Sequence, residues 1–333
     1  MKGLLLAAVC LLSSVVYSQD IHFSQFFEAP LLRNPSLAGI FTGDIRVQAV
    51  YRDQWNSVTN AYKTGSINGE YKMPIGKAED FITAGLQILY DRAGTVSWTS
   101  THVLPALNYH KSLSAEKNSY LSLGFMGGGV WRSFDRSKMT TNTQYDGQGD
   151  GETFIDSKYN YVDGAVGMSY NTQLNDNPDN NIFFGLAYHH ITKPKNSFYR
   201  NGSAQVEAKW VASGGVKFSV TPASYITLQA DHSRQGKFIE TVAGALYGIK
   251  IGPDLDHPNY TLHGGSFLRW NDAIIPVIKL DYSPFSASIS YDVNISKLKT
   301  SSYGRGGFEF AISYVGFLDR DNSSLNAVNC PRF

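Results

Sequence analysis

The sequence predicts an all-β protein, a transmembrane antiparallel β-barrel of about fourteen strands. The first observation behind this prediction is the stretch FSASISYDVNIS, residues 285–296, in which apolar and polar residues alternate without a break. Successive side chains on a strand point to opposite faces, so one face of this strand is apolar and the other is polar. In water that pattern fits a half-buried sandwich strand. In a membrane it fits a barrel strand with lipid outside and a wet lumen inside.

The N-terminus is the second observation, and it favours the membrane. Lys2 precedes an uncharged run from Leu4 to Val16, and Ser18 offers a small residue before Gln19. This pattern predicts a secretory signal peptide over residues 1–18, too short to serve as a membrane helix. The mature chain is therefore expected to be exported.

Composition is the third observation. The chain holds 31 Gly, 20 Tyr and 19 Phe, which suits the tight curvature and aromatic girdles of barrels. After the signal peptide no apolar run reaches the roughly 18 residues that a spanning helix needs, so a helical membrane protein is excluded. A net charge of +1 without a basic block argues against a nucleic-acid partner.

Strands and turns follow one another evenly from residue 44 to residue 318, and we take this range as the barrel. An even number of strands places both ends of the barrel on the periplasmic side. The expected strands are 44–55, 61–72, 80–91, 98–111, 118–132, 158–171, 181–192, 205–220, 224–233, 237–251, 259–270, 273–282, 285–296 and 305–318.

The connections between these strands differ in length as barrel topology requires. Short turns near 221–223 and 283–284 are expected on the periplasmic side. The long connections near 133–157, 193–204 and 297–304 are expected outside the cell.

Several short strings, in order along the mature chain, carry a resemblance to a known family. They are DIHFSQFFEAPLLRNPSLAG at 20–39, YRDQW at 51–55, TTNTQYDG at 140–147, AYHHITKPKNSFY at 187–199, SYDVNISKLK at 290–299, RGGFEFAISY at 305–314 and NCPRF at 329–333. Together they resemble the PorP/SprF family of type IX secretion outer-membrane proteins.

The resemblance implies an outer-membrane barrel in contact with outer-membrane lipid and with periplasmic components of the type IX machinery. It further implies one of two roles that the sequence does not separate. The first is a component of the general translocation and motor apparatus, and the second, which we favour, is a partner that exports or retains one secreted cargo protein, such as a large adhesin in gliding motility. Two alternatives stay open. One is a passive or gated channel for hydrophobic or small solutes. The other is an outer-membrane enzyme, which the lack of a convergent triad disfavours.

Three groups of residues resemble a metal site, a catalytic triad and a calcium-binding loop, but we do not expect any of them to function as such. His189 and His190 are adjacent on an expected strand, so we expect them to point to opposite faces, where they cannot share a metal. In 231–233, Asp-His-Ser, the histidine is expected to face away from its neighbours. The calcium-like loop that starts at Asp146 lacks the bidentate Glu at its twelfth position. We therefore predict no catalytic residue, no cofactor and no metal.

The segment before the barrel, residues 19–43, is a better candidate for function. Prolines at 30 and 35 interrupt a group of apolar side chains that must be buried somewhere, and the lumen is the available place. A plug and a simple packing extension are both consistent with this segment. The candidate plug residues are Phe23, Phe26, Phe27, Leu31 and Leu32.

The tail, residues 319–333, is the second candidate. It is polar until its last residues and has too little apolar area to fold alone, so we expect it to be ordered against the barrel rim or a partner. Cys330 is the mature chain's single cysteine, which rules out an intramolecular disulfide framework. The candidate partner-binding residues are Asn329, Cys330, Pro331, Arg332 and Phe333.

Overall fold

The computed structural model describes residues 20–54, 62–75, 79–114, 116–145, 147, 151, 156–175, 177, 180–198, 204–256, 258–296 and 304–318. Within these ranges fourteen antiparallel strands form one closed barrel, in which each strand pairs with its neighbours in sequence. The strands are β1 Ile45–Gln54, β2 Tyr62–Ile75, β3 Asp80–Ala93, β4 Trp98–Ser114, β5 Ser119–Ser133, β6 Lys158–Gln173, β7 Asn181–His189, β8 Lys209–Thr221, β9 Ser224–Gln235, β10 Phe238–Ile251, β11 Tyr260–Arg269, β12 Ala273–Tyr282, β13 Phe285–Asn294 and β14 Arg305–Gly316.

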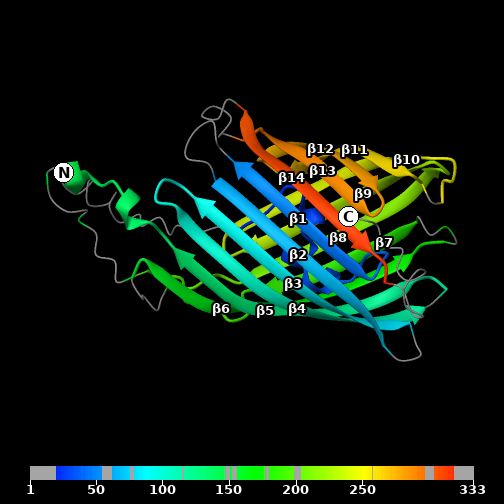
Figure 1. Ribbon diagram of the computed structural model, residues 1–333, viewed down its shortest axis with the longest axis horizontal. Coiled ribbons are helices and arrows are strands. Elements are labelled where there is room, and N and C mark those ends of the chain that lie inside the picture. The colour runs from blue at the N-terminus through cyan, green and yellow to red at the C-terminus, as the bar shows by residue number, and fades with distance from the viewer. Residues whose placement is uncertain are drawn as a thin grey trace, which may run out of the picture.

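Pairing of β1 with β14 closes the barrel. Their register runs from Ile45 opposite Gly316 to Gln54 opposite Gly307, and the two strands lie side by side in Figure 1. The barrel end where β1 begins and β14 ends is called the terminal end below, and the opposite end is called the loop end. Closure leaves no unpaired strand edge, as a barrel in lipid requires.

The two faces of the wall differ as the alternation predicts. On β13, Ile289 and Tyr291 are 44% and 40% exposed on the outward face, whereas Ser288 and Ser290 are buried on the lumen face. Exposed tyrosines lie toward both barrel ends, for example Tyr51 near the loop end and Tyr314 near the terminal end. This distribution is typical of an apolar band between two aromatic girdles.

The expected strands agree with the observed ones, apart from small shifts at their ends. The largest difference is at the start of β8, which was expected at residue 205 but begins at Lys209. β7 was expected to reach residue 192 but ends at His189. His190 adopts a left-handed backbone with φ of 60°, which is incompatible with an extended strand. No helix in the described part of the chain is long and apolar enough to span a membrane.

Short helices lie outside the wall. Three occur before β1 in the segment that enters the lumen, and two follow β5. They are η1 Phe26–Glu28, α2 Pro30–Arg33, η2 Pro35–Leu37, η3 Arg136–Lys138 and α3 Asn142–Tyr145.

Candidate functional site: the N-terminal segment inside the barrel

Residues 20–44, called the N-terminal segment here, run through the lumen from the loop end to the terminal end. At its start, Asp20 lies 3.3 Å from His190 Nε2 and 3.6 Å from Lys209 Nζ, both at the loop end. At its other end, the Asp44 backbone N–H donates to Gly316 O at 2.9 Å. In Figure 1 the dark-blue segment accordingly lies within the barrel.

Two prolines set the local structure of this segment. Pro30 and Pro35 occupy the first positions of α2 and η2, where a proline's fixed φ is favourable and its missing N–H costs nothing. The residue before a proline avoids helical geometry, so α2 ends before Asn34, which is extended at φ −162°. The Asn34 side chain then caps η2 by accepting from Ser36 N–H at 2.9 Å.

A buried carboxylate on β14 holds the segment at Ser24 and Gln25. The backbone N–H groups of Ser24 and Gln25 donate to the two oxygens of Glu309 at 2.6 and 2.7 Å. Arg52 Nη1 contacts the same carboxylate at 2.8 Å, which balances its charge. The unwound backbone of the segment is thereby satisfied inside the lumen, where unpaired N–H groups would be costly.

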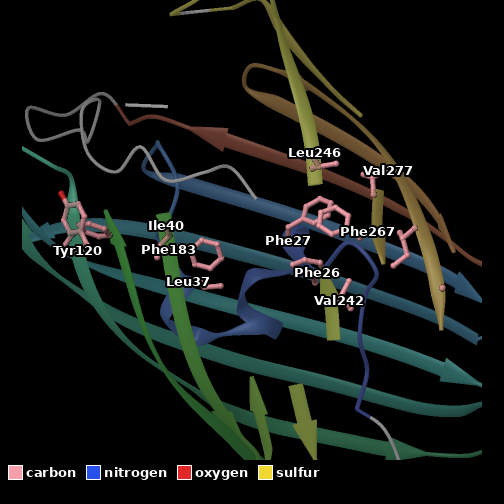
Figure 2. Packing of buried hydrophobic residues seen from close by; sticks show 13 residues of the cluster. Phe26, Phe27, Leu37, Ile40, Tyr120, Phe183, Val242, Leu246, Phe267 and Val277 are labelled. Carbon is pink, nitrogen blue, oxygen red and sulfur yellow. The ribbon is translucent and has the colours of Figure 1, made fainter. Parts of the chain in front are cut away.

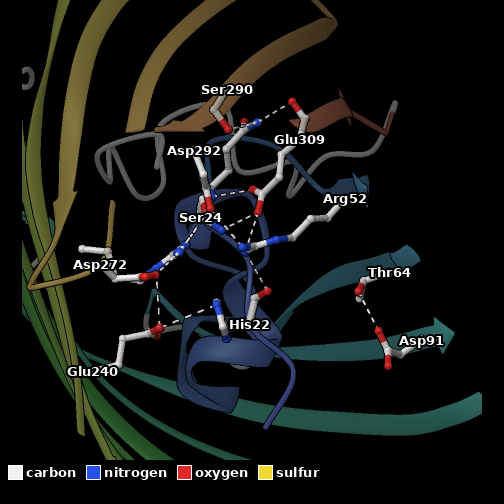
Figure 3. A network of polar contacts seen from close by, with 12 residues as sticks. His22, Ser24, Arg52, Thr64, Asp91, Glu240, Asp272, Ser290, Asp292 and Glu309 are labelled. Carbon is white, nitrogen blue, oxygen red and sulfur yellow. Dashed lines mark hydrogen bonds and ion pairs between the residues drawn. The ribbon is translucent and has the colours of Figure 1, made fainter. Parts of the chain in front are cut away.

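Asp292 on β13 extends this network to β11. Its Oδ2 accepts from Arg52 Nη2 at 3.0 Å, Arg269 Nη1 at 3.1 Å and Ser24 Oγ at 2.9 Å. Figure 3 shows these groups converging around Ser24. Three strands, β1, β11 and β13, thus meet at one carboxylate, to which a serine of the segment also donates.

A second ion pair lies at the end of α2. The Arg33 guanidinium donates to both oxygens of Asp231 on β9, with Nε at 2.6 Å from Oδ2 and Nη2 at 2.5 Å from Oδ1. The arginine also lies 4.6 Å from the Phe26 ring centroid and 5.3 Å from that of Phe183. Bidentate geometry and aromatic faces compensate for removing the arginine from water.

Two further carboxylates make similar contacts nearer the terminal end. Lys279 Nζ donates to Glu28 Oε1 at 2.6 Å, so here the acid belongs to the segment and the base to the wall. Glu70 accepts from Arg46 at 2.7 Å and from Gly39 N–H at 2.7 Å. Every one of these pairs joins residues far apart in the chain or on different strands, so together they fix the position of the segment.

Apolar contacts fill the space between these pairs. Phe27 is fully buried and stacks on Phe267 of β11 at 5.3 Å, and Phe26 meets the same ring edge-on at 5.3 Å. Figure 2 shows the three rings together beside Val242. Full burial of one such ring contributes about 1.5–3 kcal/mol, so this cluster is a large stabilising term for the segment.

Three lumen glycines allow the segment to approach the wall. A Cβ added to Gly124 on β5 would lie 2.5 Å from Pro35 C, and one on Gly185 of β7 would lie 2.8 Å from Asn34 Nδ2. A Cβ on Gly167 of β6 would overlap Asn34 Oδ1. Asn34 Nδ2 also donates to the carbonyls of Met168 and Leu186 at 3.3 and 3.2 Å. We call Gly124, Gly167 and Gly185 the glycine cradle.

Electrostatics fix the first residues of the segment. Burial opposes ionisation of Asp20, but Lys209 and His190 outweigh it and hold the pKa of Asp20 well below its usual range. Burial lowers the pKa of His190, but Asp20 and Asp163 outweigh it and raise that pKa to about 9. Burial lowers the pKa of His22 to about 4, so His22 is neutral where His190 is charged.

The structure places all five candidate plug residues in the lumen. Phe23, Phe26, Phe27 and Leu31 are buried, and Leu32 is partly buried against the cluster around Val50 and Leu89. The tail candidates Asn329 to Phe333 and the signal peptide lie outside the described residues.

Sequence reasoning was wrong about the two adjacent histidines. His189 and His190 were expected on opposite faces, but both are buried, with ring centroids 6.5 Å apart, because the chain turns at His190. In the described residues no group of three or more His, Cys, Asp or Glu is arranged to hold a metal. In 231–233 the histidine does face away from its neighbours, as expected. Asp231 binds Arg33 in the lumen, while His232 is exposed and forms a hydrogen bond with Thr241.

Sequence reasoning did not predict the ion pairs in the lumen or the glycine cradle. Asp292 and Glu309 could be assigned to a polar face by alternation, but their partners in the segment are 268 and 285 residues away. The related signal in the sequence was the density of apolar residues around Pro30 and Pro35. It indicated that the segment is buried, but not which side chains of the wall contact it.

Comparison with known families decides the affiliation of the chain. The family described as "Type IX secretion system membrane protein PorP/SprF" matches residues 15–314. The chain belongs to the PorP/SprF family. This PorP/SprF protein is thus a β-barrel membrane protein of type IX secretion, located in the outer membrane. A comparison with curated protein sequences finds no match.

Two transporters are among the similar solved structures. The toluene transporter TbuX of Ralstonia pickettii is similar with a TM-score of 0.52 at 11% identity, covering 87% of this chain and 94% of its own. The P. putida toluene transporter TodX gives a TM-score of 0.48 at 11% identity, covering 88% and 94%. At such low identity the likeness to TbuX shows a shared barrel fold and nothing about the solute.

Proposed function

We propose that this PorP/SprF barrel assists the export or surface retention of a partner protein, such as a large adhesin, as a scaffold with a filled lumen. The observation that carries the proposal is the filling of the lumen by the N-terminal segment, which buried ion pairs and aromatic packing hold to β9, β11, β12 and β14. A barrel filled in this way is suited to presenting surfaces rather than to conducting solutes.

In this proposal the N-terminal segment is a plug that includes Phe23, Phe26, Phe27, Leu31 and Leu32. A cavity of about 500 Å³ lies at the loop end beside residues 20–22, but two others along the segment, one lined by Phe23 and Val211 and one by Leu32 and His102, hold only about 50 and 30 Å³. Such volumes admit one or a few water molecules, not a hydrophobic solute. The channel alternative would require the plug to leave the lumen. Planar-bilayer recordings separate the two, since a steady pore current from the intact protein would favour a channel.

The loop end is proposed to face the cell surface and the terminal end the periplasm. Support comes from the longest connections, 134–157 and 190–208, which both lie at the loop end. The tail then leaves β14 on the periplasmic side. There Asn329, Cys330, Pro331, Arg332 and Phe333 would contact a periplasmic component, with Phe333 as apolar anchor and Arg332 as polar anchor.

Deletion of residues 329–333 tests the scaffold role. We expect the truncated chain to insert as a heat-modifiable barrel and to lose surface display of its cargo, measured by antibody labelling of intact cells. A matched control replaces residues 322–324 with alanines, which alters the tail but keeps its end. Normal cargo display by the truncation would remove these five residues from the mechanism, and failure to insert would make them an assembly signal.

A further inference from the structure

A cavity of about 500 Å³ opens beside the start of the N-terminal segment. Its floor is formed by residues 20–22, and its walls come from lumen-facing positions of β1 to β5 near the loop end. This volume lies within the range of about 300–1,000 Å³ that is usual for small-molecule sites. We call it the outer vestibule. The lining residues that matter below are Gln54, Tyr62, Thr64, Asp91, Trp98 and Arg132.

The side chains of the vestibule are held in place by contacts behind them. Trp98 meets Phe198 edge-on at 4.9 Å, and Phe198 also packs edge-on against Phe134 and Tyr159. Trp98 nevertheless stays 38% exposed. Thr64 Oγ1 donates to Asp91 Oδ1 at 2.7 Å, as Figure 3 shows, which orients that carboxylate. A site whose groups are fixed before binding loses less entropy when a ligand arrives.

Arg132 gives an independent indication of a ligand. Its Nη1 donates to Asn196 Oδ1 at 2.8 Å, and its guanidinium lies 5.6 Å from the Tyr161 ring centroid. Its Nε is buried without a hydrogen-bond partner among the described residues. A buried unpaired donor on a charged group is costly, and a ligand or bridging water in the vestibule would satisfy it.

The chemistry of the lining narrows the ligand class. Asp91 and Arg132 carry opposite charges, so the walls favour neither a simple anion nor a simple cation. Gln54 and Thr64 can each donate and accept hydrogen bonds, while Trp98 offers a flat apolar ring. Asp20 is already engaged by His190 and Lys209 and does not shift this balance. The matching ligand is neutral, rich in hydroxyl groups, and apolar on one face.

We propose that the outer vestibule binds a saccharide, one to three sugar units in size, whose ring stacks on Trp98 and whose hydroxyls bond Asp91 and Arg132. The sugar could belong to a glycan on a partner or to an outer-leaflet lipid, and both present the same chemistry. This inference goes beyond the scaffold role, since it concerns binding by the barrel alone, and only the placement of the vestibule at the cell surface rests on the orientation proposed above.

The test uses the full-length protein, purified in detergent and fluorescently labelled, on an array of defined glycans. A bound glycan is then titrated in solution by tryptophan fluorescence. Asp91→Asn and Trp98→Ala should each weaken its binding by about tenfold or more. The matched control is Trp131→Ala, which removes an exposed outward-facing tryptophan near the same rim and should leave binding unchanged. Heat-modifiable gel mobility confirms that each variant is folded.

Two results would overturn the proposal. One is an array on which folded protein binds no glycan above the level of heat-unfolded protein. The other is binding that folded Asp91→Asn and Trp98→Ala variants retain in full. A tripeptide library run in parallel distinguishes the other neutral ligand class, and binding of peptides without glycans would assign the vestibule to a peptide. To separate the two sources of sugar, free oligosaccharide and lipopolysaccharide compete with the bound glycan.

Discussion

Gly167 on β6 and Asn34 of the N-terminal segment lie so close together that a Cβ at residue 167 would overlap the Asn34 side-chain oxygen. That oxygen is also the cap of η2, since it accepts from Ser36 N–H. This close approach of the segment to the wall and the local fold of the segment therefore depend on the same atom. Glycine at 167 is required by this contact rather than by backbone conformation.

Gly167→Ala should destabilise the seated segment by about 1–3 kcal/mol, the usual cost of overpacking a filled interior. The measurement is hydrogen exchange of the amides in residues 30–38, which should become faster. Gly69→Ala is the matched control, because a Cβ there meets nothing within 4 Å. Unchanged exchange in Gly167→Ala would mean that the glycine cradle does not set the position of the segment.

Asp231→Ala should cost about 3–5 kcal/mol, because it leaves the Arg33 charge buried without its partner. The side chains of Arg33 and Asp231 are only 2% and 13% exposed, so solvent offers little compensation. Urea unfolding followed by gel mobility measures the loss. Replacing both residues, Arg33→Met with Asp231→Leu, should recover much of it. A single-variant loss below about 1 kcal/mol would contradict a buried role for this pair.

Ile289→Arg should cost about 2–4 kcal/mol of barrel stability, since this outward side chain on β13 would face lipid. Ile289→Leu serves as the control and should be nearly neutral. Ser288→Arg is no simple lumen comparison, because Ser288 is buried and donates to Gln25 at 2.5 Å. It should displace the segment while the barrel stays folded. Equal losses in Ile289→Arg and Ile289→Leu would argue against lipid on this face.

Stability should depend on pH through His190. Its folded pKa of about 9 exceeds the ordinary 6.5, so the charged ring stabilises the start of the segment fully below pH 6.5. This contribution is then lost as the pH rises through about 9. The measurement is the difference in urea midpoint between the wild type and His190→Gln from pH 6 to 10. The difference should shrink across this window, and a constant difference would exclude the contacts of charged His190 with Asp20 and Asp163 as its source.

An epitope tag in the stretch 147–151 should be reachable on intact cells, because this connection lies at the loop end. A tag at Pro178, in the connection between β6 and β7 at the opposite end, should be reachable only after the outer membrane is permeabilised. Flow cytometry with and without permeabilisation measures both. Reversed accessibility would invert the orientation proposed for the barrel.

The sequence by itself determined the wall of this protein. The alternation of Ser288, Ile289, Ser290 and Tyr291 is a local property with a period of two, and hydrogen bonds between consecutive strands need only a turn between them. Fourteen strands, their approximate bounds and their lipid and lumen faces could therefore be predicted. The N-terminal segment was recognisable only as apolar chain in need of burial.

The tertiary structure decided what fills the lumen and how it is held there. Closure of β1 on β14 brings Glu309 to Ser24 and Gln25, across nearly the whole chain. It likewise sets Gly124, Gly167 and Gly185, on three different strands, against Asn34 and Pro35. No short-range pattern encodes these contacts, because each depends on register and curvature around the closed barrel. The partners of the lumen charges, the joint burial of His189 and His190, and the outer vestibule all follow from that closure.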